Sequence, residues 1–144
     1  MVGRREFLVF EAINIPFGCV MLFNVVQLKK DVALADVEQA LGEVCNAVKE
    51  HYGDSEGGFV GGQVFKYAGF VSQQGSFATG RTVENHIVIV TYWKSFEQHE
   101  NSHIDRVFND KFCALLEYCE DIYEIGYQML WQGDSQAGGK PSPH

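Results

Sequence analysis

Four short segments of this sequence have the apolar pattern of β-strands, and two longer segments between them have helical spacing. Residues 21–28, 59–67, 86–93 and 122–131 are short and apolar or alternate in polarity. Residues 34–52 and 96–119 carry apolar side chains every three or four positions. The order β-α-β-β-α-β predicts an α+β chain of the ferredoxin-like type with a four-stranded antiparallel sheet.

A sheet of this kind has helices on only one of its faces, and the sequence leaves the other face apolar. We therefore expect a second copy to cover it, giving a homodimer in which two sheets form a dimeric α/β barrel. A chain of 144 residues is most simply one domain. The expected boundaries are an N-terminal extension over 1–20, the α+β domain over 21–133 and a disordered Gly/Ser/Pro tail over 134–144.

Charge and cysteine content limit the partners and the compartment. The formal net charge is −8, and the basic residues cluster only at Arg4-Arg5 and Lys29-Lys30, which argues against nucleic acid and anionic membranes. No apolar run reaches the roughly 18 residues of a transmembrane helix. The four cysteines form no C-x-x-C pair. We expect a cytoplasmic protein that acts on a small molecule.

The segment from Ser95 to His103 contains the strongest candidate site. Ser95 followed by Gln98 reads as a capping box, so a helix is expected to begin at residue 96. His99 and His103 then lie one turn apart, where two imidazoles reach one metal ion. A carboxylate from elsewhere would complete the two-His-one-carboxylate ligand set of non-haem Fe(II) oxygenases. Glu124 is expected to face inward, on the same side of the last strand as Ile122.

Three patches resemble one protein family. Residues 90–94 (VTYWK) lead into the histidine pair, residues 122–125 (IYEI) follow, and Val44-Cys45 precedes residues 58–61 (GFVG). Each is similar to a stretch in the N-terminal half of sulfur oxygenase reductase. The resemblance implies a mononuclear non-haem iron held by His99, His103 and Glu124. It also implies that Cys45 is a catalytic thiol that carries a small sulfur-containing substrate as a persulfide.

Two other functions remain open from the sequence. His-Glu-x-x-His is also the signature of zinc peptidases, in which Glu100 would be the general base. The fold alone resembles metal-free dimeric α/β-barrel proteins of the antibiotic-biosynthesis monooxygenase and stress-response kinds. In such a protein, His99 would be a polar group beside an apolar ligand. Five residues separate Cys113 from Cys119, and the resemblance assigns no role to either.

Overall fold

Four antiparallel strands form the central sheet of the protein. The computed structural model describes residues 12–71, 77–78, 86–103 and 105–135. The sheet contains β1 (Val20–Leu28), β2 (Phe59–Lys66), β5 (His86–Trp93) and β6 (Cys119–Gln128), in the spatial order β2-β5-β1-β6. A separate two-stranded ladder joins β3 (Phe70–Val71) to β4 (Phe77–Ala78).

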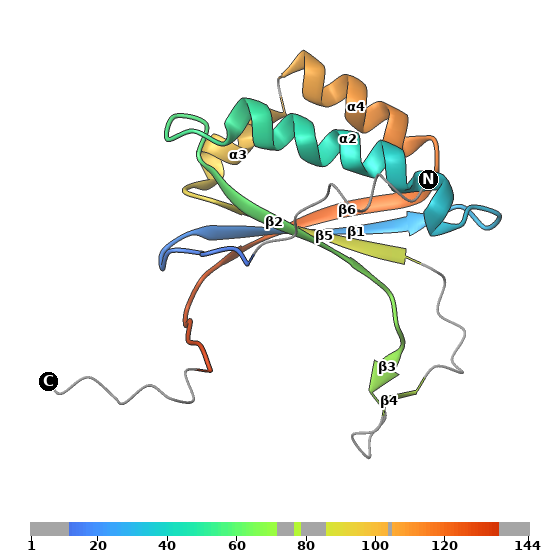
Figure 1. The fold of residues 1–144 in the computed structure, drawn as a ribbon, viewed down its shortest axis with the longest axis horizontal. Coiled ribbons are helices and arrows are strands. Elements are labelled where there is room, and N and C mark those ends of the chain that lie inside the picture. Colours follow the sequence, from blue (N-terminus) through green and yellow to red (C-terminus); the bar gives the residue numbers. More distant parts are fainter. Residues whose placement is uncertain (1–11, 72–76, 79–85, 104, 136–144) are drawn as a thin grey trace, which may run out of the picture.

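Within the described residues, three helices cover one face of the sheet and none lies on the other, which we call the helix-free face (Figure 1). These are α2 (Leu34–Tyr52), α3 (Phe96–Ser102) and α4 (Arg106–Leu116). Solved structures share this arrangement, as described below, and the predicted ferredoxin-like α+β fold is confirmed. No helix in the described part of the chain is long and apolar enough to cross a membrane.

The register of β1 assigns each strand residue to one face. Successive side chains on a strand point to opposite faces, so Val20, Leu22, Val26 and Leu28 lie together. All four are buried against α2 or α4, with Val37 and Leu41 among their contacts. The main buried clusters of the described residues therefore lie between the sheet and the helices. The odd-numbered residues of β1 face the opposite side.

The predicted single helix over 96–119 is two helices. Asp105 caps the second, because its carboxylate accepts a hydrogen bond from the Phe108 backbone N–H at 3.1 Å. The Asn109 side chain also donates to the His103 carbonyl at 2.9 Å. These two polar side chains satisfy backbone groups at the break, which spacing of apolar residues does not reveal. The last strand ends at Gln128, three residues earlier than predicted.

The helix-free face of the sheet is rich in exposed apolar and aromatic side chains. Each odd-numbered residue of β1 on this face has one neighbour on β5 and one on β6, and the three together form a row across the sheet. The rows are Met21 with Tyr92 and Tyr127, Phe23 with Val90 and Ile125, and Val25 with Val88 and Tyr123. Tyr123, Ile125 and Tyr127 are all exposed. Exposed apolar patches of this kind mark interaction sites.

Parts of the predicted domain organisation lie outside the described residues. Residues 1–11 of the expected N-terminal extension and 136–144 of the expected tail belong to this group. The boundaries at 20 and 133 stay predictions.

Residues 12–17 contact the helix-free face, because Ile13 and Ile15 lie 3.4 and 3.6 Å from where a Cβ on Gly61 would stand.

One hydrogen bond ties the end of α2 to the start of α4. The Tyr52 hydroxyl donates to Asp105 Oδ2 at 2.7 Å. Burial, then this hydrogen bond and the carboxylate charge, raise the pKa of Tyr52 to about 12. Since the folded pKa lies above the ordinary value of 10.0, the stabilisation is complete below that value and is lost as the pH rises through about 12.

Tyr52→Phe is expected to lower the free energy of unfolding by about 1 kcal/mol at pH 7, because it removes this hydrogen bond. Urea denaturation measures the change. In a tyrosinate absorbance titration, the variant should lack one component near pH 12. Unchanged stability, or loss of a component near pH 10 instead, would contradict the bond.

Candidate functional site

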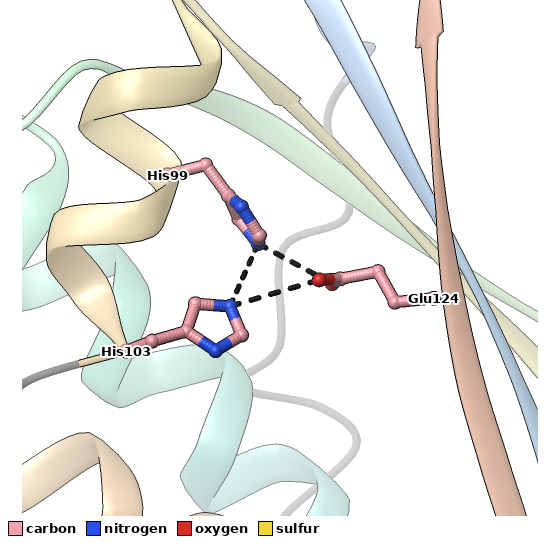
Figure 2. Close-up of side chains that lie close together, drawn as sticks. All are labelled: His99, His103 and Glu124. Atoms are coloured by element: carbon pink, nitrogen blue, oxygen red, sulfur yellow. Dashed lines mark hydrogen bonds and ion pairs between the residues drawn. The ribbon is translucent and has the colours of Figure 1, made fainter.

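Three side chains from α3 and β6 converge under the helices (Figure 2). His99 lies in α3, His103 is the residue that ends it, and Glu124 lies on β6. His99 Nε2 is 3.0 Å from His103 Nε2 and 3.3 Å from Glu124 Oε2. His103 Nε2 is 3.6 Å from Glu124 Oε1. We call these residues the His–His–Glu cluster.

The start of α3 is held in place by a cap and by a neighbouring loop. Ser95 Oγ accepts a hydrogen bond from the Gln98 backbone N–H at 3.2 Å, as predicted. The Gln98 side-chain amide donates to the carbonyls of Ser55 and Glu56 at 3.2 and 3.0 Å. Gly58 makes room for this amide, since a Cβ there would overlap it. The loop before β2 therefore positions the residue next to His99.

Glu124 reaches the cluster because of its register on β6. It pairs with Asn24 of β1, whose other neighbour in the sheet is Ile89. Asn24 Nδ2 donates to the Ile89 carbonyl at 3.2 Å and also contributes a side-chain hydrogen bond to Glu124. Both polar residues lie on the helix-covered face, as the alternation predicted for Glu124. Asn24 was not predicted as a site residue, although it is a polar residue in an apolar strand.

His99 is the buried member of the cluster, with 4% of its surface exposed. Its ring packs edge-on against Trp93, with 5.3 Å between centroids. Its Nδ1 lies 3.4 Å from Glu100 Oε1, but the geometry is not that of a hydrogen bond, and Nδ1 has no hydrogen-bond partner among the described residues. The other nitrogen, Nε2, is therefore the atom through which His99 interacts.

The pKa of Glu124 reflects two opposing influences. Burial raises it, whereas the hydrogen bond from His99, the charges of His99 and His103 and the hydrogen bond from Asn24 lower it. The net pKa lies below the ordinary value. With 27% of its side chain exposed, Glu124 keeps contact with water. The cluster thus contains an ionised carboxylate beside two imidazoles at neutral pH.

The cluster forms one side of an apolar cavity of about 200 Å³ between the sheet and the helices. Most of the surface that lines it is apolar, and Asn24, Thr91 and Ser102 are in the wall beside the cluster. Its lining includes Trp93, Ile89, Phe108, Phe112, Leu115 and Ile122. A concave apolar space with a few convergent polar groups is the usual form of a small-molecule site.

Cys45 lies on α2 away from the cavity wall. Its neighbour Val44 lines the cavity and also belongs to the buried cluster against which Cys45 packs, but Cys45 is not among the residues that line the cavity. Burial raises the pKa of the Cys45 thiol, which disfavours the reactive thiolate. Helical spacing placed Cys45 on the inward side of α2. Inward residues at different positions along a helix contact different parts of the core. The catalytic role of Cys45 stays a prediction without support from this placement.

Glu100 does not join the cluster. Its side chain is 73% exposed and approaches Nδ1 of His99, whereas the cluster forms at Nε2. A general base of a zinc peptidase must reach a water bound at the metal. The His-Glu-x-x-His sequence therefore lacks the peptidase arrangement here.

The geometry of the cluster allows two kinds of chemistry. Two imidazole nitrogens 3.0 Å apart repel each other unless a proton or a cation lies between their lone pairs. With a proton there, the cluster is an acid–base group that shares protons with Glu124. With a cation there, it is a metal site, and the ligand atoms of all three residues lie within 4.8 Å of one another.

Comparisons with known proteins give the fold but no close relative. No family model matches the chain, and no curated protein matches it by sequence. SnoaB, a cofactor-independent oxygenase from Streptomyces nogalater, has a similar structure with TM-score 0.53 and 12% identity, covering 83% of this chain and 98% of its own. A candidate antibiotic biosynthesis monooxygenase from Nitrosomonas europaea gives TM-score 0.56 and 9% identity, covering 78% and 99%.

A third similar structure has a different activity. Hydroxynitrile lyase from Passiflora edulis gives TM-score 0.57 and 10% identity, covering 83% of this chain and 100% of its own. Identities this low establish the fold alone. Because the same fold carries an oxygenase and a lyase, function has to be argued from the site.

These comparisons correct the predicted cofactor. The mononuclear iron inferred from the resemblance is wrong, because the similar structures include a cofactor-independent oxygenase and a candidate antibiotic biosynthesis monooxygenase, which point away from non-haem iron. The comparisons give no support to sulfur oxygenase reductase in particular and support the resemblance only for the ferredoxin-like α/β-barrel type of fold. The three cluster residues as metal ligands are a separate prediction that no comparison tests.

The contact between Gly58 and Gln98 yields a prediction for stability. Gly58 has a φ of +79°, in the left-handed region. Gly58→Ala is expected to lower the free energy of unfolding by about 1–2 kcal/mol from the backbone alone, with an added cost for displacing Gln98. Urea denaturation measures it.

Gly42→Ala is the matched control, because Gly42 lies within α2 and has open space around its missing Cβ. Alanine there should raise the free energy of unfolding by roughly 0.5–1 kcal/mol. If both variants shift stability in the same direction, the role assigned to Gly58 is wrong.

Proposed function

We propose that this protein is a cofactor-independent oxygenase of the antibiotic-biosynthesis monooxygenase type. Its substrate is a small apolar ring compound with an acidic CH₂ group. The observation that carries this proposal is the position of the His–His–Glu cluster on the wall of an apolar cavity. The fold of SnoaB, a cofactor-independent oxygenase, supports it.

Cavity size and lining favour a one- or two-ring molecule. An apolar cavity of about 150 Å³ is enough to bind benzene, and the cavity here is about 200 Å³. Trp93, Phe108 and Phe112 offer aromatic surfaces. The cluster is at one side of this space, so a bound ring would direct its acidic group toward His99 Nε2 and Glu124.

Proton removal is the step that the chain's own residues supply. His99 Nε2 takes the proton when the neutral ring carries its hydrogen on Nδ1, and the Nε2–H that forms donates to the adjacent carboxylate of Glu124, which stabilises the imidazolium. A delocalised substrate anion can then give one electron to O₂ and combine with the superoxide formed. Loss of water from the peroxide converts the CH₂ group to a carbonyl, so that R₂CH₂ + O₂ gives R₂C=O + H₂O without another reductant.

His99→Ala is expected to reduce O₂ uptake with 2-tetralone, a two-ring carbon acid, by roughly 10²–10⁴-fold, the usual contribution of a general base. An oxygen electrode measures the rate. With 4-nitrophenol, wild type should bind the yellow phenolate, and the variant should bind the neutral phenol.

His51→Ala is the matched control, because it removes an exposed histidine at the end of α2. Its rate and its spectrum should equal those of wild type. Full oxygen uptake by His99→Ala would overturn the base assignment, and absence of uptake by wild type with every carbon acid of one or two rings would overturn the oxygenase.

A second candidate function is binding of a divalent cation other than iron at the same three residues. A tetrahedral ion about 2.0–2.1 Å from its ligands needs ligand atoms about 3.3 Å apart. The observed separations of 3.0, 3.3 and 3.6 Å match this requirement. The ordered carboxylate and the unprotonated Nε2 atoms would be the donors, and water would complete the shell.

Calorimetric titration with Zn²⁺ measures binding of the ion, and oxygen uptake with and without Zn²⁺ separates the two candidates. If the cluster is a metal site, wild type should bind one Zn²⁺ and His103→Ala none, since two ligands hold the ion poorly. If the cluster works as a base, chelator-treated wild type should retain its oxygen uptake, and added Zn²⁺ should inhibit by occupying Nε2. Uptake that requires Zn²⁺ would overturn the cofactor-independent mechanism.

The helix-free face supports a homodimer, in which a second copy covers the apolar rows of β1, β5 and β6. A matching apolar surface removes the exposed Tyr123, Ile125 and Tyr127 from water, and a two-fold axis brings identical patches together. Sedimentation equilibrium that gives 16.2 kDa, the mass of one chain, at all concentrations would contradict the dimer. The cytoplasmic location stays a prediction.

A further inference from the structure

The segment after β6 contains the two most exposed large apolar side chains among the described residues. Leu130 is 90% exposed and Trp131 is 81% exposed. Water contact of this extent is unfavourable, since an apolar side chain of this size is more stable when it is buried. We call residues 129–135 the C-terminal arm.

A hydrogen bond attaches the C-terminal arm to the segment before β1. Gln132 Nε2 donates a hydrogen bond to the Ile15 carbonyl at 2.6 Å. Ile15 belongs to the segment before β1 that contacts Gly61 on the helix-free face. The arm is therefore fixed beside this face while Leu130 and Trp131 stay exposed.

The arm continues the apolar side of β6. Tyr123, Ile125 and Tyr127 alternate along the helix-free side of that strand, and the same alternation in sequence leads to Met129 and Trp131. β1 begins at Val20, the partner of Gln128, so the sheet ends where the arm begins. The arm thus extends the apolar surface beyond the edge of its own sheet.

The shape of the molecule shows where a partner fits. Figure 1 shows the arm and the β3–β4 ladder projecting from opposite ends of the sheet, both on the side away from the helices. Between them lies the apolar helix-free face. A body placed against that face would lie between the two projections and would contact both.

We propose that the C-terminal arm packs on a second copy of this chain, with Trp131 as its anchor. This proposal rests on the dimer described under the proposed function. A two-fold axis through the helix-free face makes each copy both donor and acceptor of an arm. Tryptophan at the centre of such a contact contributes more than most residues, because it buries a large area and loses little conformational freedom.

The two tryptophans of the chain provide a direct test. Trp93 is 1% exposed and Trp131 is 81% exposed in the single copy. In protein labelled with 5-fluorotryptophan, each gives one ¹⁹F resonance, and Trp131→Phe assigns them. The H₂O-to-D₂O shift of each resonance reports its contact with water, and sedimentation equilibrium on the same samples gives the mass.

The expected result is a dimer in which the Trp131 resonance shows little solvent shift, with a large shift appearing when dilution produces monomer. Trp131→Ala should weaken the dimer at least tenfold. Val107→Ala is the matched control, because Val107 is an exposed apolar residue on α4, on the helix side of the sheet. It should leave the dissociation constant unchanged.

Other outcomes overturn the proposal in distinguishable ways. A dimer in which Trp131 keeps its full solvent shift would remove the arm from the interface and leave the homodimer intact. A monomer at every concentration would overturn the dimer and the arm together. A monomer in which Trp131 is protected would show that the arm packs on its own chain, and equal weakening by Val107→Ala would show that Trp131 has no special role.

Discussion

The pairing of β1 with both β5 and β6 is the constraint on which the rest of the structure depends. Each residue of this central strand from Val20 to Gln27 has a fixed neighbour on either side, and successive residues alternate between the helix-covered and the helix-free face. Asn24 therefore lies between Ile89 and Glu124 on the covered face. A slip of one residue would send Glu124 to the helix-free face and Tyr123 toward the helices. The cluster, the cavity and the apolar face all follow from this one register.

Sequence periodicity was sufficient to predict the fold and the side of the last strand on which Glu124 lies. The alternation around Glu124 and the four-residue spacing of His99 and His103 are local properties, and the structure places these residues as the spacing suggested. The break after α3 was missed because side chains of Asp105 and Asn109 create it by bonding to the backbone. Periodicity also did not predict what Cys45 contacts, because it indicates which side of a helix faces inward but not which residues lie there.

The chemistry of the cluster was harder to predict than its position. Two imidazoles and a carboxylate are a familiar set of metal ligands, and the same three groups also exchange protons with a substrate. The sequence contains no signal that separates these uses. The structure adds that His99 interacts through Nε2, that Nδ1 makes no hydrogen bond among the described residues and that the cavity beside the cluster is apolar. His99 itself is buried, so water screens the electrostatic effect of Glu124 on the His99 imidazolium less than it would at the surface.

The two faces of the sheet are connected through β6. This strand is at an edge and pairs only with β1 within the described sheet. Its position is therefore held by backbone hydrogen bonds on one side only. Glu124 stands between Tyr123 and Ile125, which point to the opposite face. Packing a second copy against these two residues would restrict the movement of β6 and thereby hold the Glu124 carboxylate at its distance from His99 and His103. Assembly on one face would then maintain the geometry of the site on the other.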